Sequence, residues 1–350
     1  MSDKWLQAFL ITSFTMKIST LAIDQASALT DFYNEQFGDM PYCYPVTEEE
    51  FETGVWWDEE RDGEPYDDLS DESLLVVEDD DGYVAGFAHV AVCRKGEEDH
   101  RIGLHPIEEL LKDRIGLIRF FHYRAGARPA GQALLEATEA HLRSFGIDQI
   151  RAFSYFGYRF YRFCHAFQSD RMGHVGALLS MNDYRITRGI ILLELPDFDV
   201  PDPVLPDAGV TTCFEIQAGR GRLPNMSFQL FRGDQCIGQG FAQSLGDFCR
   251  SPLAQETFYI PWFSIEGSPV GGRVSEGEQG KGFGRYMMEV LLREMRQLGY
   301  RHATTQANTG SPRPILLYTN MGYRVVDTNY QYFKDLEKEI PLGVFKEVGF

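Results

Sequence analysis

The sequence repeats one order of predicted elements, and this repeat restricts the fold more than any other feature. In residues 225–306, the spacing of apolar residues predicts a two-stranded hairpin and a third strand, followed by a small-residue loop, an amphipathic helix and a short strand. Residues 73–153 predict the same elements in the same order, although few residues are identical. We therefore expect two copies of one α/β unit, each built on a mixed sheet.

A proline-rich segment separates the two copies. Residues 196–206 contain four prolines, and proline at that density is incompatible with a helix interior or a central strand. The chain of 350 residues is also too long for one ordinary domain. We expect an N-terminal domain over 16–196, a linker over 197–206 and a C-terminal domain over 207–350. The segment before Met16 lacks the features of a signal peptide and is expected to be an extension.

Composition excludes several classes of protein. A net charge of −19 repels nucleic acid and anionic lipid and favours cationic small molecules. No apolar run is long enough to span a membrane. The six cysteines include no CxxC pair and the eight histidines no HExxH motif, so we expect reduced, mostly buried thiols, no metal and a cytoplasmic location. The acidic stretch over 48–82 is either a solvated loop region or an acidic funnel for an amine.

The glycine-rich loop "QGKGFG" at 279–284 precedes the amphipathic helix of the second copy. First-turn N–H groups have no intrahelical acceptor, and glycine allows a close backbone approach, so this junction predicts an anion site. Two familiar phosphate motifs do not fit. A dinucleotide fingerprint would need glycine where Arg285 stands, and a P-loop would need Ser or Thr after Lys281, where Gly282 stands.

The pattern that does fit is Q/R-x-x-G-x-G/A, at Gln279, Gly282 and Gly284. A segment with Leu-Tyr and Gly-Tyr pairs follows, "SPRPILLYTNMGYRVV" at 311–326. Together they resemble the pyrophosphate loop and the next motif of the GNAT acyltransferase superfamily, over about residues 226–335. The resemblance implies two tandem GNAT domains, an architecture similar to that of mycothiol synthase, with acetyl-CoA as the acyl donor.

The resemblance also implies roles for individual residues. Tyr318 stands where the family places its general acid, and Glu266, at the end of the fourth strand, where many members keep a base; the alternatives are a core tyrosine and an ordinary strand-end carboxylate. His302 is a lesser candidate that we expect to be structural. The residues expected to bind the cofactor are Ser264, Ile265, Gln279, Gly280, Lys281, Gly282, Phe283, Gly284, Arg285 and Ser311. For Lys281, a contact with pyrophosphate and exposure to solvent are equally open.

Three departures from the family pattern stand in the second copy. The insertion at 268–278 is longer than the expected link and is interpreted as a flap over the cofactor. Ser311 replaces a usual asparagine, and with Pro312 behind it we expect a good helix N-cap. The start of the copy lacks the length for helices that would wall an acceptor site. Residues 29–71 of the first copy have that length, so we expect the first domain, or a partner chain, to supply part of the acceptor pocket.

The first copy keeps a fainter version of the loop, "RPAGQA", with Arg128, Gly131 and Ala133 at the pattern positions. Pro129 removes one N–H from it. Alignment places Ser180 opposite the tyrosine of the second copy, so we expect this domain to be non-catalytic, although it keeps a candidate second CoA site. The aromatic segment 155–167 interleaves arginines as surfaces for single-stranded nucleic acid do, but the net charge disfavours this, and we expect an aromatic seam that packs the first domain's cofactor cleft or the interdomain face.

The function that follows is N-acetyl transfer from acetyl-CoA to a primary amine of a small molecule by direct attack on the thioester. The alternative is a non-catalytic CoA- or metabolite-binding regulator with the same fold. We expect a cationic small-molecule acceptor, no nucleic acid, no membrane and a monomer or homodimer.

Overall fold

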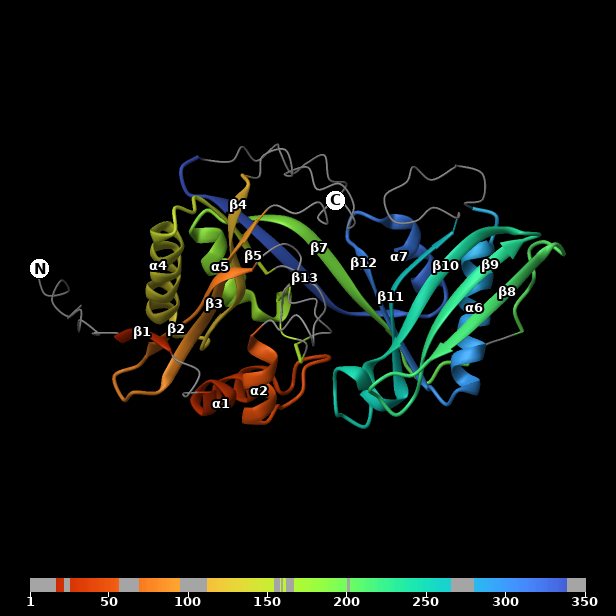
Figure 1. Cartoon of the computed structure of the whole chain (residues 1–350), viewed down its shortest axis with the longest axis horizontal. Coiled ribbons are helices and arrows are strands. Elements are labelled where there is room, and N and C mark those ends of the chain that lie inside the picture. The colour runs from red at the N-terminus through yellow and green to blue at the C-terminus, as the bar shows by residue number, and fades with distance from the viewer. Residues whose placement is uncertain are drawn as a thin grey trace, which may run out of the picture.

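Both halves of the chain contain the predicted elements in the predicted order (Figure 1). The computed structural model describes residues 17–21, 26–56, 69–94, 112–153, 158, 160–161, 167–199, 202–265 and 280–338. The first half contains β1 (Lys17–Leu21), α1 (Ala26–Phe37), α2 (Glu48–Val55), β2 (Ser70–Glu78), β3 (Val84–Arg94), β4 (Arg114–Tyr123), α4 (Arg128–Ser144), β5 (Gln149–Ala152), β6 (Gln168–Ser169), α5 (Gly173–Met181) and β7 (Arg185–Leu195). The second half contains β8 (Val210–Gln217), β9 (Asn225–Arg232), β10 (Gln235–Ser244), β11 (Thr257–Ile265), α6 (Phe283–Gln297), β12 (His302–Asn308), α7 (Pro312–Asn320) and β13 (Arg324–Asp335).

One mixed sheet runs through both halves. Its strand order is β1-β2-β3-β4-β5-β13-β7-β12-β11-β10-β9-β8. The last strand of each half lies beside the other half: β13 pairs with β5 and β7, and β7 pairs with β13 and β12. These two long strands cross the middle of the molecule in Figure 1. The division at 197–206 stays a prediction, because the sheet continues without a break between the halves.

Strand β4, in the first half, is buried on both faces. Every residue of β4 after Arg114 is buried. Part of the predicted aromatic seam belongs to this core, where the Phe160 ring lies 5.0 Å from Tyr33 of α1 and the Tyr161 ring lies 5.4 Å from Phe37. The described residues of this segment pack against α1, and the predicted position of the seam at the cofactor cleft or the interdomain face stays a prediction.

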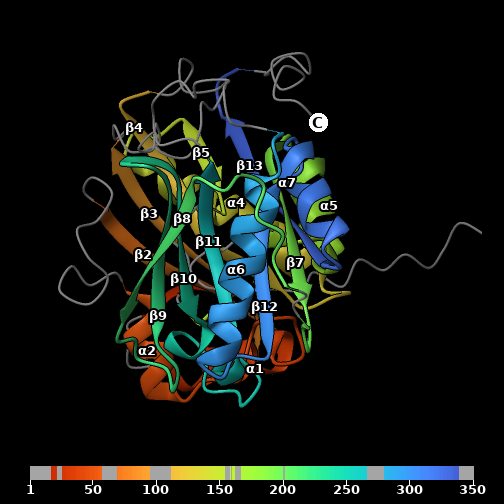
Figure 2. The same ribbon diagram turned by 90° about the vertical axis from the view of Figure 1, so that its right-hand side faces the viewer.

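Helices α6 and α7 lie on one face of the sheet in the second half (Figure 2). The apolar stripe of α6, including Met287, Leu291 and Met295, is buried as predicted. Residues 218–224, which join β8 to β9, contain no helix, in contrast to α1 and α2 of the first half. On this uncovered face, Tyr42 and Tyr44 of the first half pack against a small apolar cluster that includes Leu245 and Tyr259. The first half thus covers part of the face that the missing helices would have covered.

Two sequence predictions concern residue types. The described cysteines form no disulfide with one another. Cys93 and Cys249 are buried, but Cys213 is exposed and Cys43 and Cys236 are half-buried, so the expectation of mostly buried thiols was wrong for these five. Within the described residues, no helix is both long and apolar enough to cross a membrane.

Candidate active site

The glycine-rich loop enters α6 through backbone conformations that suit glycine. Gly280 and Gly282 have φ angles of 81° and 89°, and Gly282 is the N-cap residue of the helix. The N–H groups of residues 283–285 have no acceptor inside the helix. The N–H of Tyr286 is the first to donate back, to the Gly282 carbonyl at 3.0 Å. The loop therefore offers three N–H donors and the positive end of a helix to an anion.

Strands β11 and β12 separate beside this loop. Their parallel pairing ends at Ile260 and Thr305, although β11 continues to Ile265 and β12 to Asn308. Pro261 follows the last pair directly and has no N–H for a further ladder bond. The register of β11 against β10 also shifts at this place, as in a β-bulge. The two strands consequently form a V whose wide end lies toward the N-terminus of α6.

Gly284 marks the point where three elements meet. A Cβ atom on Gly284 would lie 3.6 Å from Leu317 of α7, 3.7 Å from Ile265 of β11 and 3.9 Å from Phe263 of β11. These are ordinary contact distances, so the first turn of α6, the end of β11 and α7 lie close together. These three elements carry the glycine loop, the Ser264–Ile265 segment and the Leu-Tyr motif named in the sequence analysis.

Tyr318 lies at the narrow end of this cleft. Its side chain is buried, and its ring lies 6.3 Å from Phe263 and 5.3 Å from Tyr323. Burial raises the pKa of Tyr318 to about 12, while a hydrogen bond with Thr305 acts in the opposite direction. Thr305 belongs to the last parallel pair of β11 and β12, so the phenol reaches the point where the strands part. At neutral pH it keeps its proton and can act as a donor.

The remaining cofactor-binding candidates differ in their positions. Ser264 and Ile265 are half-buried at the end of β11, as predicted. Phe283 is buried in the core, with the guanidinium of Arg232 5.0 Å above its ring, so its backbone faces the loop while its side chain packs. Ser311 is the N-cap residue of α7, but its side chain makes no capping hydrogen bond, and in this respect the prediction of a good cap was wrong.

The charged candidates are only partly described. Arg285 forms an ion pair with Glu289, one turn further along α6, at 2.7 Å. Lys281 is exposed in the loop. Gln279, Glu266 and the insertion at 268–278 lie outside the described residues, so the predicted base and the predicted flap stay predictions.

His302 lies away from the wide part of the V. It begins β12, at the end of the strand opposite to the wide part of the V. Its Nδ1 accepts a hydrogen bond from the backbone N–H of Asp197 at 3.0 Å. This agrees with the expectation that it is not the base.

The corresponding cleft of the first half is filled by its own side chains. A Cβ on Gly131 would meet the Tyr123 ring at 2.6 Å, so this ring lies against the first turn of α4. The Tyr123 hydroxyl donates to the His174 carbonyl, and the His174 ring bonds the Tyr123 carbonyl, both at 2.9 Å. Side-chain amides of Gln132 and Asn182 join α4 to α5. Tyr123 and α5 thus close the space next to the first-half loop.

The predicted residues of the first-half loop occupy the start of α4. Arg128 and Ala133 lie in its first two turns, and the Gly131 N–H donates to the Ala127 carbonyl at 3.1 Å. Ser180 is exposed on α5, and its neighbour Leu179 is buried. Neither position offers a buried hydroxyl like that of Tyr318. The geometry agrees with a first half that has no general acid.

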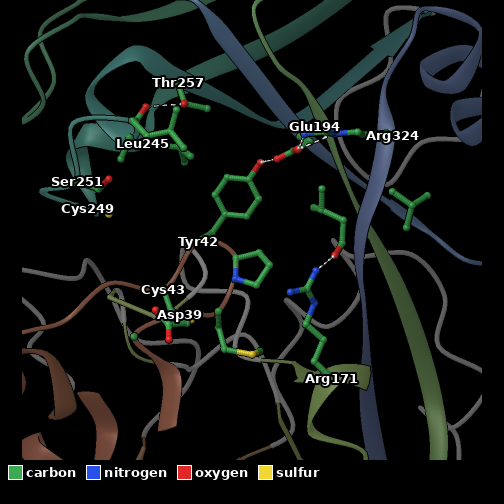
Figure 3. Close-up of a pocket in the computed structure, with 17 residues that line it drawn as sticks. Asp39, Tyr42, Cys43, Arg171, Glu194, Leu245, Cys249, Ser251, Thr257 and Arg324 are labelled. Atoms are coloured by element: carbon green, nitrogen blue, oxygen red, sulfur yellow. Dashed lines mark hydrogen bonds and ion pairs between the residues drawn. The ribbon is translucent and has the colours of Figure 1, made fainter. Parts of the chain in front are cut away.

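A cavity of about 630 Å³ lies between the two halves, on the face of the sheet that the first half covers (Figure 3). The first half contributes the loop after α1 and Arg171, and the second contributes the β10–β11 connection and the start of β13. The lining residues used below are Asp39, Tyr42, Arg171, Glu194, Leu245, Ala254, Arg324 and Val326.

Tyr42 forms one wall of this cavity and links the halves. It is a non-glycine residue with a φ of 60°, a conformation that the surrounding structure must stabilise. Its hydroxyl donates to Glu194 Oε2 at 3.0 Å, and Arg324 donates to Glu194 Oε1 from Nε and Nη2 at 2.8 and 2.6 Å. Burial raises the pKa of Tyr42, and a hydrogen bond with Thr304 lowers it. Tyr42 therefore reaches β7 and β12 from the first half.

Comparisons with known proteins identify the fold. No family model matches the sequence, and no curated protein matches it by sequence. A GCN5-related N-acetyltransferase from Sphaerobacter thermophilus aligns with a TM-score of 0.54 at 16% identity, over 93% of this chain and 98% of that one. A tandem GNAT protein from the clavulanic acid biosynthesis pathway aligns with a TM-score of 0.58 at 11% identity, over 92% of this chain and 98% of that one. This chain has the tandem GNAT fold.

A third structure extends the likeness. A GCN5-related glucosamine N-acetyltransferase region of a fungal multi-domain GH3 β-N-acetylglucosaminidase aligns with a TM-score of 0.58 at 14% identity. The match covers 93% of this chain but 38% of that longer protein. Identities this low establish the fold alone. The predicted fold class is confirmed, with a GNAT-type V and glycine loop in the second unit.

The individual residues that line the cavity of this tandem GNAT fold were not identified from the sequence. Tyr42, Arg171 and Glu194 belong to no motif, and they are brought together from distant parts of the chain. The signal that did exist was a difference in length: the first GNAT unit has a long segment between its first two strands, and the second has a short one.

Proposed function

We propose that this protein is an N-acetyltransferase whose second GNAT unit transfers an acetyl group from acetyl-CoA to a primary amine of a small molecule. The observation that carries the proposal is the position of Tyr318, a buried and protonated phenol at the narrow end of a V that opens toward the glycine loop. An anion site and a proton donor therefore lie at the two ends of one cleft.

The loop and the strand suit acetyl-CoA in different ways. The diphosphate fits the N–H groups of residues 283–285, with Lys281 as a nearby cation. The pantetheine arm is an amide chain, and β11 beyond Pro261 has backbone groups that β12 does not bond. Ser264 and Ile265 lie on this stretch. Gly284 lets the first turn of α6 lie close to the end of β11 and to α7 beside this stretch.

The chemistry is direct acyl transfer. The neutral amine attacks the thioester carbonyl, and N–H groups on the wide part of β11 stabilise the developing oxyanion. The C–S bond then breaks, and the leaving thiolate takes a proton from the Tyr318 hydroxyl. A thiol has an ordinary pKa of about 8.5, and burial raises it as it raises that of the phenol, so both groups favour their protonated forms in the cleft. The proton lost by the amine restores the phenol.

The first GNAT unit has a supporting role in this proposal. Tyr123 fills its cleft, and neither Ser180 nor Leu179 provides a buried hydroxyl. Its loop after α1 packs on the face of the second unit's sheet that has no helix of its own, and this loop lines the interdomain cavity. We therefore assign it to the wall of the acceptor pocket, with one acetyl-CoA bound per chain.

The test is a pair of matched tyrosine variants. Tyr318→Phe removes the proposed acid and should lower kcat by about 10²- to 10⁴-fold while acetyl-CoA affinity stays the same. Tyr323→Phe is the control, because this neighbouring buried tyrosine has a hydroxyl without a hydrogen-bond partner in the described part of the chain. It should retain turnover. Equal turnover of the two variants would contradict the assignment, and acetyl-CoA binding without turnover in the wild-type protein would favour a regulatory binder.

A further inference from the structure

The interdomain cavity and Tyr318 lie on opposite sides of one short piece of β12. The Tyr42 hydroxyl, in the cavity wall, donates to Glu194, whose partner on β12 is Thr304, whereas Tyr318 lies beside Thr305. Consecutive residues of a strand face opposite sides of a sheet. Because Thr305 belongs to the last parallel pair with β11, the cavity approaches the narrow end of the V from the face opposite to α6. The cavity and the cleft are thus neighbours across this part of β12.

The charges that line the cavity differ from those of the whole protein. The chain carries a net charge of −19, whereas the cavity is lined by two arginines and two carboxylates. The carboxylate of Glu194 is already engaged by Arg324 and by the Tyr42 hydroxyl. The remaining charged groups, Arg171 and Asp39, are of opposite sign and exposed at the mouth. The lining is therefore balanced and does not favour a polycation.

Arg171 is positioned to bind an anion. Its Nη2 donates to the Val326 carbonyl at 2.9 Å, which holds the guanidinium beside the cavity, as Figure 3 shows. A guanidinium has five N–H donors in a planar fork that matches carboxylate and phosphate oxygens. Across the cavity, Leu245 and Ala254 supply an apolar wall. About 630 Å³ is within the range of pockets that hold small molecules.

We propose that this cavity is the acceptor pocket and that the acceptor is a primary amine carrying an oxyanion group, a carboxylate or a phosphate, on a partly apolar body. This rests on the proposed acetyltransferase function. Arg171 binds the oxyanion, the apolar wall contacts the body, and the amine points toward the end of the V. The molecule is zwitterionic before it reacts, which matches the balanced lining. The expectation of a cationic acceptor came from the net charge of the whole chain, and we base this proposal on the charges that line the cavity instead.

The experiment compares amines that differ in the anion alone. Release of CoA thiol is measured with L-phenylalanine against phenethylamine and with O-phosphoethanolamine against ethanolamine, and spermidine serves as the polycation. We expect at least one anion-bearing amine to exceed its anion-free partner at least tenfold in kcat/KM, and the pair that shows it distinguishes carboxylate from phosphate. A preference for spermidine, or no preference in either pair, overturns the proposal.

A matched arginine pair tests the residue. Arg171→Gln should raise KM for the preferred amine at least tenfold and leave kcat/KM for its anion-free partner within twofold. Arg293→Gln is the control, since Arg293 pairs with Asp202 on the surface and does not line the cavity. An Arg171 variant that keeps the wild-type preference overturns the assignment of this residue.

Acetyl-CoA binding separates the two levels of failure. Its dissociation constant, measured by calorimetry, should be the same in the wild-type protein and both arginine variants. Absence of acetyl-CoA binding would refute the proposed function itself. Calorimetric titration of the full chain with the same amine pairs would then still show whether the cavity binds the anion-bearing amine of each pair more tightly than its anion-free partner.

Discussion

Two alanine substitutions in the glycine loop should have opposite effects on stability. Gly282 is the N-cap of α6 with a φ of 89°, so an alanine there must adopt a left-handed conformation. The expected cost is about 1–2 kcal/mol of the free energy of unfolding. Gly284 lies inside the first turn of the helix, where its Cβ would meet Leu317 and Ile265 at ordinary contact distances. Gly284→Ala should therefore stabilise the protein by about 0.5–1 kcal/mol.

The assay is urea unfolding of both variants beside the wild-type chain, followed by calorimetric titration with acetyl-CoA. We expect the order Gly284→Ala, wild type, Gly282→Ala from most to least stable. We also expect Gly282→Ala to weaken acetyl-CoA binding at least tenfold, because the loop N–H groups are reoriented. Gly284→Ala should bind within about threefold of wild type. Equal stability of the two variants would refute the left-handed conformation of Gly282. Unchanged acetyl-CoA binding in Gly282→Ala would mean that the loop does not bind the cofactor.

Three further predictions concern pH and the link between the halves. Burial lowers the pKa of His122 to about 3, so folding favours its neutral form and the free energy of unfolding falls as pH drops below about 6.5. Between pH 7 and pH 5, His122→Phe should therefore lose about 2 kcal/mol less of this free energy than the wild-type chain in urea titrations. An equal loss in both proteins would count against this. With a pKa of about 12, Tyr318 keeps its proton to pH 10, so its ionisation should cause no decline in turnover between pH 8 and pH 10. A decline near pH 9 that disappears in Tyr318→Phe would mean that Tyr318 ionises in this range. Tyr42→Phe removes a hydrogen bond to a carboxylate and should destabilise the chain by about 1.5–3 kcal/mol, which a shift in thermal unfolding checks; an unchanged midpoint would mean that this bond is not formed in solution.

Local features of the fold could be predicted because they depend on residue type and on the spacing of neighbouring residues. The glycines at 280 and 282 adopt the positive φ angles that their residue type suggested. The stripe on α6 is buried as its spacing predicted. Pro261 also carried a signal that was not used, since a proline inside a strand pattern indicates an interrupted ladder. The separation of β11 from β12 at this residue follows that rule.

The arrangement of the two halves was beyond sequence reasoning. Nothing in residues 324–335 indicates that this strand pairs with β5 and β7, because many pairings bury the same apolar face. The bond from Tyr42 to Glu194 joins residues 152 positions apart, and no periodicity reports such a contact. The closure of the first cleft depends on the direction of the Tyr123 ring. Ser311 is a further example: its position as the N-cap was predictable, but its side chain makes no capping hydrogen bond.

The most direct test of the account is the stoichiometry of acetyl-CoA binding to the full chain. We predict one site per chain, lost when Gly282 is replaced by valine and retained when Ala130 of the first-half loop is replaced by valine. Two sites in the wild-type chain would contradict the filled cleft around Tyr123. No binding at all would contradict the central claim that the second GNAT unit is built to hold acetyl-CoA.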